Sequence, residues 1–223
     1  MGRVWGIVVA GGSATRFGEE KQFASLAGRP VAEWAVVACR SVCDSVVLVV
    51  PADALSSDAT KRLGADVSVA GGATRAASVR AGLEALGADA EVVVVHDAAR
   101  PLARPQLFKA VLSALDGADV AGAICAVPVT DTIKRVVARP SGDHGEASVV
   151  ETLDRSDLVA VQTPQAFSVE VLRRAHCGDP DATDDAALVE ALGLTVSVVP
   201  GDPDNLKLTT PADLARAELL AAR

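Results

Sequence analysis

Aromatic residues are scarce in this chain of 223 residues. Tyrosine is absent and the aromatic share is only 3%, although 50% of the residues are apolar. Alanine and valine dominate the apolar half, a composition that suits a valine-rich parallel sheet covered by alanine-rich helices. We therefore expect an α/β fold, and the length is sufficient for one domain with a sizeable core over residues 1–223.

Long apolar runs and an excess of basic residues are also missing. No run approaches the ~18 residues that a membrane-spanning helix needs, and the N-terminus does not resemble a signal peptide. With 21 Lys and Arg against 29 Asp and Glu, the formal net charge is −8, which argues against a nucleic-acid or anionic-membrane surface. We therefore expect a cytoplasmic protein without nucleic-acid or membrane partners, in which a polyanionic substrate would meet a local basic pocket.

Cysteine pairs typical of metal sites are missing as well. The four cysteines form no C-x-x-C motif and no second ligand pair: Cys39, Cys43, Cys125 and Cys177. Reduced, mostly buried thiols are therefore favoured over disulfides or a zinc site.

The apolar runs and helix signals that are present predict alternating strands and helices, the pattern of a parallel sheet. Strands are expected over residues 4–9, 45–50, 67–69, 91–95, 120–127, 159–162 and 195–199. Helices are expected over residues 30–39, 54–63, 105–115, 169–175 and 184–192, with one more ending near Leu86 and a last one with Thr210 as N-cap and Pro211 at its first position. Residues 129–158 differ, because two short β-like pieces flank a polar turn and carry too few apolar residues for a core of their own.

A glycine-rich stretch after the first apolar run is the strongest functional signal. It contains small residues followed by two cations: Ala10, Gly11, Gly12, Arg16 and Lys21. A backbone with few side chains can wrap around an anion and aim its N–H groups at it, and the cations add positive charge. A polyphosphate at the carboxyl end of the first strand is the simplest ligand, although ordinary loops share this composition.

Two common phosphate motifs are absent from this stretch. A dinucleotide fingerprint would need glycine in place of Ser13, and a P-loop would need lysine after Gly18, where the chain has Glu19. A nicotinamide dehydrogenase is therefore disfavoured.

Five motifs occur in order along the chain. They are A-G-G-x-x-x-R with K-Q-F at residues 10–23, V-H-D-A-A-R-P at 95–101, D-T-I-K at 131–134, Q-T-P-Q at 162–165 and N-L-K at 205–207. Together they resemble the 2-C-methyl-D-erythritol 4-phosphate cytidylyltransferases, a family of nucleotide-sugar type nucleotidyltransferases. The resemblance covers essentially the whole chain. It implies a Rossmann-like, mostly parallel sheet flanked by helices, and transfer of CMP from CTP to 2-C-methyl-D-erythritol 4-phosphate with release of pyrophosphate, a step of non-mevalonate isoprenoid synthesis.

The resemblance also implies roles for individual residues. Arg16 and Lys21 would be catalytic, acting on the triphosphate and the transition state. The nucleotide would contact Ala10, Gly11, Gly12, Gly72, Arg75, Ser78, Asp97 and Ala98, with the pyrimidine at the Gly71–Gly72 loop. Asp97, at the end of a buried strand, would approach the ribose or an Mg²⁺ ion bound with the CTP phosphates.

The acceptor is expected opposite the triphosphate. By resemblance it is contacted by Thr163, Thr183, Asp204 and Lys207 of one subunit and by Thr132 and Arg155 of the other. Residues 129–158 would then be an arm that hooks around the partner in a homodimer, although the pattern alone fits an exposed hairpin as well. Thr183 and the two aspartates after it also have the sequence of a helix start.

The chain departs from the family pattern at three positions. Ala14, Glu20 and Ala73 stand where the family usually has glycine, proline and aspartate.

Two other functions remain open. A ribitol 5-phosphate cytidylyltransferase shares the glycine loop and K-Q-F. A non-catalytic nucleotide-binding module is disfavoured, because binding alone does not require cations at the α-phosphate. Among the histidines, His96 is predicted to be packed and hydrogen-bonded, and His176 to lie at the surface.

Overall fold

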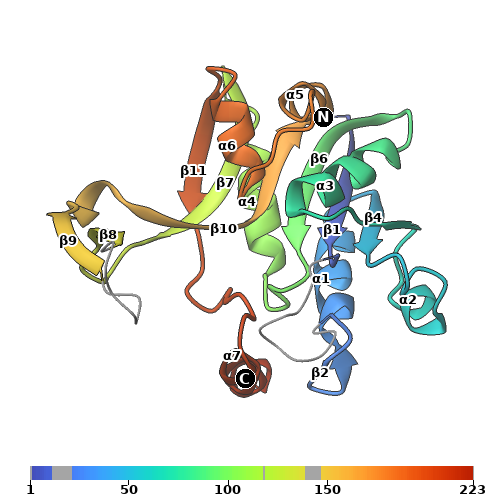
Figure 1. Cartoon of the computed structure of the whole chain (residues 1–223). Coiled ribbons are helices and arrows are strands. Elements are labelled where there is room, and N and C mark those ends of the chain that lie inside the picture. Colours follow the sequence, from blue (N-terminus) through green and yellow to red (C-terminus); the bar gives the residue numbers. More distant parts are fainter. Residues whose placement is uncertain (1, 12–21, 118, 139–146, 223) are drawn as a thin grey trace.

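The computed structural model describes residues 2–11, 22–117, 119–138 and 147–222. In this part of the chain a seven-stranded sheet lies between helices on its two faces (Figure 1). The predicted α/β class with a mostly parallel sheet is therefore confirmed.

The strands of the main sheet run parallel, with one exception. In the order in which they are hydrogen-bonded, the strands are β11 (Thr195–Pro200), β7 (Val120–Pro128), β10 (Val159–Ser168), β6 (Ala90–Asp97), β1 (Arg3–Val9), β4 (Ser45–Val50) and β5 (Val67–Ala70). Only β10 is antiparallel to its neighbours. The carboxyl ends of β1, β5 and β6 therefore meet at one edge, which is where open α/β sheets bind ligands.

Alternating side chains of the strands divide the core between two helical layers. Helices α1 (Val31–Arg40) and α4 (Pro105–Ala114) cover one face, and α3 (Arg75–Glu84), α5 (Val169–Ala175) and α6 (Asp185–Glu190) cover the other. In β4, Leu48 packs with the first layer while Val47 and Val49 pack with the second. Such strands, buried on both faces, read as continuous apolar runs in the sequence.

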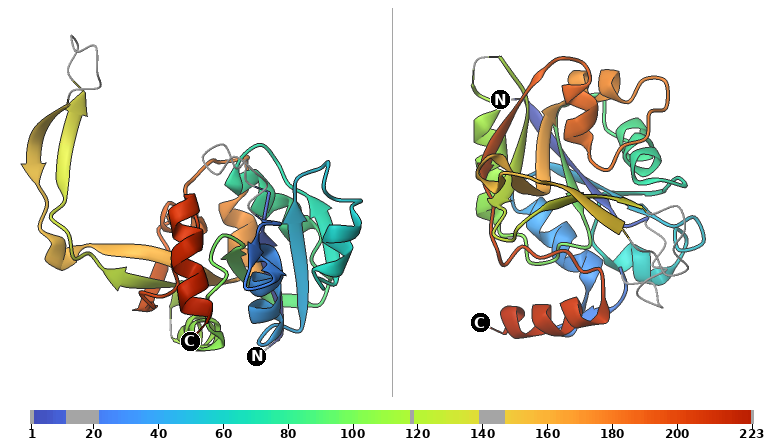
Figure 2. Two further views of the ribbon diagram at one scale, coloured as in Figure 1. Left: turned by 90° about the horizontal axis from the view of Figure 1, so that it is seen from below. Right: turned by 60° about the vertical axis from the view of Figure 1, so that its left-hand side comes forward.

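A two-stranded hairpin projects from the body of the molecule. Strands β8 (Lys134–Ala138) and β9 (Ala147–Thr152) pair only with each other and extend away from the main sheet (Figures 1 and 2). Four of their valines are 52–60% exposed: Val136, Val137, Val149 and Val150. The structure thus confirms the predicted hairpin arm, and it leaves an apolar surface on it.

The last helix, α7 (Pro211–Ala221), closes the end of the fold beside the small hairpin β2 (Ser25–Leu26) and β3 (Arg29–Pro30). Its predicted start is confirmed. Thr210 accepts a hydrogen bond from Asp213 N, and the Asp213 side chain accepts one from Thr210 N in return. Leu208 and Ala217 are buried there with Leu26 and Val31.

Two predicted elements differ most in length from the observed ones. Helix α2 covers only Asp58–Arg62, because the Ser57 side chain caps its first turn and residues 54–57 form turns. The strand predicted to end at residue 162 continues through Pro164 to Ser168, with a register shift between Val161 and Gln165. Proline lacks the N–H of a regular ladder and is tolerated at such irregularities, so the sequence signal for a strand end was misleading.

No helix in the described ranges is long and apolar enough to cross a membrane. All four cysteines lie in these ranges and none forms a disulfide. Cys39, Cys43 and Cys125 are buried, and Cys177 is exposed.

Candidate active site

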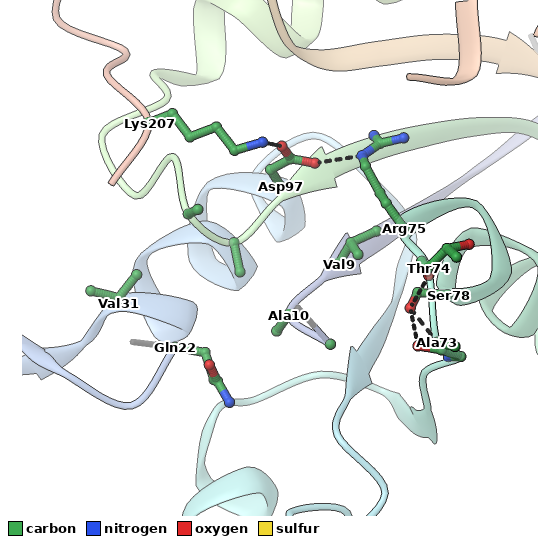
Figure 3. A pocket seen from close by; sticks show the side chains of 14 residues that line it. Val9, Ala10, Gln22, Val31, Ala73, Thr74, Arg75, Ser78, Asp97 and Lys207 are labelled. Atoms are coloured by element: carbon green, nitrogen blue, oxygen red, sulfur yellow. Dashed lines mark hydrogen bonds and ion pairs between the residues drawn. The ribbon is translucent and has the colours of Figure 1, made fainter. Parts of the chain in front are cut away.

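Two adjoining cavities lie at the carboxyl ends of the parallel strands. The first, of about 290 Å³, lies between the ends of β1 and β6 and the start of α3 (Figure 3). It is lined by every predicted nucleotide residue that the structure describes: Ala10, Gly11, Gly72, Arg75, Ser78, Asp97 and Ala98. The structure therefore brings these residues together around one cavity.

The second cavity, of about 450 Å³, lies on the other side of Asp97, toward β10 and α6. Three of the residues predicted for the acceptor, Thr163, Thr183 and Lys207, line it. Arg75, Asp97 and Lys207 line both cavities, so these three side chains form the wall between them.

Asp97 is held between two cations. Its Oδ2 accepts a hydrogen bond from Lys207 Nζ at 2.7 Å and its Oδ1 one from Arg75 Nε at 3.1 Å (Figure 3). Burial by itself would raise the pKa of this carboxyl, but the charges of Arg75 and Lys207 outweigh it and hold the pKa well below its usual value. The wall between the cavities is therefore an ionised cluster at any physiological pH.

Glycines beside the first cavity allow the Gly71–Gly72 loop to approach α3 closely. A Cβ on Gly71 would lie 2.8 Å from Ser78 Oγ, and a Cβ on Gly72 would lie 2.4 Å from the Cβ of Ala77. Ser78 Oγ donates to Thr74 O at 3.0 Å and accepts from Gly72 N at 3.2 Å. The Gly71–Gly72 loop is thus fixed against α3, which leaves its outer side facing the cavity.

A buried hydrogen-bond network supports the wall from behind. Asp97 N donates to Thr163 Oγ1, and the Thr163 hydroxyl contacts His96 Nδ1, both at 3.0 Å. His96 Nε2 then donates to Arg100 O at 3.1 Å. Burial lowers the pKa of His96 to about 4, so the ring is neutral. The prediction that His96 is a packed, hydrogen-bonded residue is confirmed.

Several polar residues around the cavities were not predicted as site residues. Gln22, part of K-Q-F, lines the first cavity, while Gln165 and Asp184 line the second and share a 3.2 Å hydrogen bond. In the sequence, Gln22 and Gln165 were marked only as members of a motif, and Asp184 only as the residue after Thr183. The prediction for His176 was wrong: it is buried, because its Nε2 pairs with the buried Asp185 at 2.9 Å.

Two groups of predicted residues remain. Gly12, Arg16 and Lys21 lie outside the described residues, and the described Thr132, Arg155 and Asp204 do not line the two cavities. Thr132 and Arg155 are exposed at the base of the arm, where Arg155 donates to the carbonyl of Thr130. Asp204 lies 3.4 Å from Arg104 Nη2 in a separate depression beside α1 and α7.

Among the described residues, no three carboxylate, histidine or cysteine side chains gather into a metal cluster. Asp97 is the one carboxylate of that part of the chain that lines the first cavity, and both its oxygens contact cations. Each of these oxygens keeps a second lone pair, so Asp97 can supply the one protein ligand that suffices for Mg²⁺ where substrate phosphates and water supply the others.

Comparisons with known proteins identify the family to which the chain is similar. Residues 4–223 match the model of the family described as 2-C-methyl-D-erythritol 4-phosphate cytidylyltransferase. A protein of that name from Cereibacter sphaeroides is 44% identical over 97% of this chain and 96% of its own length. A bifunctional IspD/IspF enzyme from an Anaeromyxobacter species is 45% identical over 96% of this chain, but the chain spans only 56% of that relative's length.

Solved structures show the same relationship. A structure titled 4-diphosphocytidyl-2C-methyl-D-erythritol synthase, from Anaerococcus prevotii, superposes with a TM-score of 0.82 at 28% identity, covering 100% of this chain and 99% of that one. A 2-C-methyl-D-erythritol 4-phosphate cytidylyltransferase from Thermus thermophilus gives 0.78 at 34% identity, covering 97% and 98%. Because the family model and relatives of 44–45% identity cover nearly the whole chain, this chain belongs to the 2-C-methyl-D-erythritol 4-phosphate cytidylyltransferase family, a family of nucleotidyltransferase enzymes.

Proposed function

We propose that this chain transfers CMP from CTP to 2-C-methyl-D-erythritol 4-phosphate, with the nucleotide in the first cavity and the acceptor in the second. The observation that carries this assignment is the shared wall of Arg75, Asp97 and Lys207. Transfer between two substrates requires their reacting groups to meet, and two cavities divided by a charged wall bring them to a common boundary.

The first cavity suits a pyrimidine nucleotide. The backbone of Gly72 and Ala73 offers polar groups of the kind that cytosine can bind, and the cavity of about 290 Å³ is small. The triphosphate would lie beside Ala10 and Gly11. Arg16 and Lys21 follow in the sequence, and we assign them to the phosphates from the motif.

The second cavity suits a phosphorylated polyol. Arg75 and Lys207 bring positive charge to it and Thr183 a hydroxyl, which are the groups that bind phosphate and hydroxyls. Thr163 also lines it, although its hydroxyl already contacts Asp97 N and His96.

The reaction needs no general base, because the attacking group is a phosphate oxygen that is already anionic. It attacks the α-phosphorus of CTP, and pyrophosphate leaves. Repulsion between the anions and the charge gathered on the five-coordinate phosphorus form the barrier, and cations fixed before the reaction lower it. Mg²⁺ held by the CTP phosphates and Asp97 would neutralise part of the triphosphate charge.

The arm belongs to the same proposal. Its exposed valines and the position of Thr132 and Arg155 at its base favour a homodimer in which each arm packs on the other subunit. Thr132 of the partner subunit and Arg155 of the partner subunit would then reach the acceptor. Two-fold symmetry makes this exchange reciprocal.

A pyrophosphate-release assay tests the proposal. With Mg²⁺ present, CTP with 2-C-methyl-D-erythritol 4-phosphate should support turnover, whereas ATP and GTP should not replace CTP. Faster turnover with ribitol 5-phosphate would assign the other cytidylyltransferase activity. Binding of CTP without pyrophosphate release from either acceptor would instead indicate a non-catalytic module.

A further inference from the structure

A buried hydrogen-bonded pair behind the two cavities, Asp185 and His176, has no part in the proposed chemistry. Asp185, the first residue of α6, is 1% exposed, and His176, at the end of α5, is 2% exposed. His176 Nε2 donates to Asp185 Oδ1 at 2.9 Å, and Asp185 Oδ2 accepts from Arg75 Nη1 at 2.8 Å. A buried carboxylate is costly unless it is paired, and Asp185 is paired on both oxygens, one with His176 and the other with Arg75.

The pair fixes the guanidinium of Arg75 from the side opposite Asp97. Arg75 Nε donates to Asp97 Oδ1 and its Nη1 to Asp185 Oδ2, so two carboxylates from different elements determine the plane of the group. Burial opposes the charged form, but Asp185 and Asp97 outweigh it and raise the pKa of Arg75. Arg75 therefore keeps its charge although its side chain is only 19% exposed.

The same contacts tie three elements together. Arg75 begins α3, His176 ends α5 and Asp185 begins α6. The segment between the last two carries Thr183 and Asp184, which line the second cavity. Loss of the Asp185 contact would leave Arg75 with one of its two carboxylate partners and would remove the link between Arg75 and this segment.

We propose that Asp185 and His176 are positioning residues, which hold Arg75 in one orientation toward both cavities and hold residues 176–184 against the second. Asp185 acts on Arg75 directly, and His176 acts by fixing Asp185. The inference rests on the proposed function, because its effect is read in cytidylyl transfer.

A double-mutant cycle tests the role of Asp185. Asp185→Asn keeps the shape but removes the charge, and it should lower kcat/KM by about 10- to 100-fold, the loss expected when a substrate-facing group is misplaced. In an Arg75→Gln background the same substitution should lower kcat/KM several-fold less than it does in the wild type, because the guanidinium on which Asp185 acts directly is gone. Equal losses in both backgrounds would overturn the inference.

His176 provides a second, independent test. Glutamine can place an amide N–H near the position of Nε2, whereas leucine cannot donate. His176→Leu should raise KM for both substrates and lower kcat, and His176→Gln should restore kcat/KM to within about threefold of wild type. If both variants lower the melting temperature but keep wild-type kcat and KM, His176 is only structural and the inference fails.

A matched control lies on the same segment. Asp179 pairs with Arg80 at 3.1 Å but is 85% exposed and lines neither cavity. Asp179→Asn should leave kcat/KM unchanged. The wild-type enzyme separates the two claims: no turnover in wild type would refute the proposed function, whereas active wild type with an additive cycle would refute only the positioning role.

Discussion

At the scale of single residues, the ion pairs of Asp97 explain how an acidic protein can face polyanions. The chain carries a net charge of −8, yet the wall between the cavities holds two cations against one carboxylate. Lys207 is 41% exposed and Asp97 only 10%, so the positive partner is the one that reaches outward. Local charge rather than net charge therefore decides what binds here.

Removal of Lys207 should affect activity more than folding. Lys207→Ala is expected to lower kcat/KM by about 100-fold, the typical loss for one preorganised charge contact. Asp97 would still be paired with Arg75, so the melting temperature should change little. Steady-state kinetics and thermal unfolding measure the two effects. Lys61→Ala serves as control, because that lysine is 68% exposed and pairs only with Asp58.

Burial of neutral His96 should make folding stability depend on pH. Its pKa is lowered from 6.5 to about 4, so between these values the unfolded chain binds a proton that the folded chain does not. The free energy of unfolding should therefore fall as the pH decreases from 6.5 toward 4. Denaturant titrations at several pH values should show that the free energy of unfolding falls less steeply with decreasing pH in His96→Asn than in the wild type. Equal slopes for the variant and wild type would contradict the neutral histidine.

At the scale of elements, local signals determined most boundaries. Helix α5 was predicted with its observed bounds, and α7 with its N-cap Thr210 and Pro211 at its first position, because caps and proline act within one turn. The end of β10 was missed because the strand continues beyond Pro164 through pairing with β6 and β7, and local sequence does not show such pairing.

The cap of α7 yields a prediction with a defined pH dependence. Hydrogen bonds from Thr209, and further ones from Thr210, lower the pKa of Asp213 from 3.8 to about 2. Because the pKa of Asp213 is lower in the folded chain than in the unfolded chain, the ionised side chain stabilises the fold at pH values above 3.8. This contribution is lost as the pH falls from 3.8 toward 2. Asp213→Ala should cost about 1 kcal/mol at neutral pH, as cap losses typically do. Urea titrations should show this difference shrinking in acid, and a constant difference would contradict the role of the ionised side chain.

The site was predictable only where a motif covers it. Asp97 and Lys207 belong to two of the five motifs and Arg75 follows the Gly71–Gly72 loop to which the family resemblance pointed, and the structure brings the three together. Asp185 and His176 carried no such signal, because their importance depends on a contact with Arg75, which lies 110 residues away from Asp185 in the sequence. Contacts of this kind follow from the packing of α3 against α5 and of α5 against α6, which local patterns do not encode.

At the scale of the whole molecule, the proposed homodimer predicts complementation. Lys207→Ala and Arg155→Ala homodimers should both be nearly inactive. When equal amounts are unfolded and refolded together, half the dimers should be mixed, and each mixed dimer has one site with both defects and one with neither. About a quarter of wild-type activity should return. If mixed dimers are verified by mass but the activity of the mixture stays as low as that of the two variants, both residues serve the same site from one chain.

The central claim is that donor and acceptor occupy separate, adjoining cavities, and a crossed blocking experiment tests it most directly. Ala73 lines only the first cavity and Thr183 only the second, and both are exposed, so a large side chain is accommodated at either without disturbing the core. The quantities to measure are KM for CTP and KM for 2-C-methyl-D-erythritol 4-phosphate in Ala73→Trp and in Thr183→Trp. Ala73→Trp should raise KM for CTP at least about tenfold and leave KM for the acceptor within about twofold, and Thr183→Trp should do the reverse. An exchange of these effects, or equal effects of each variant on both substrates, would contradict the assignment of the two cavities.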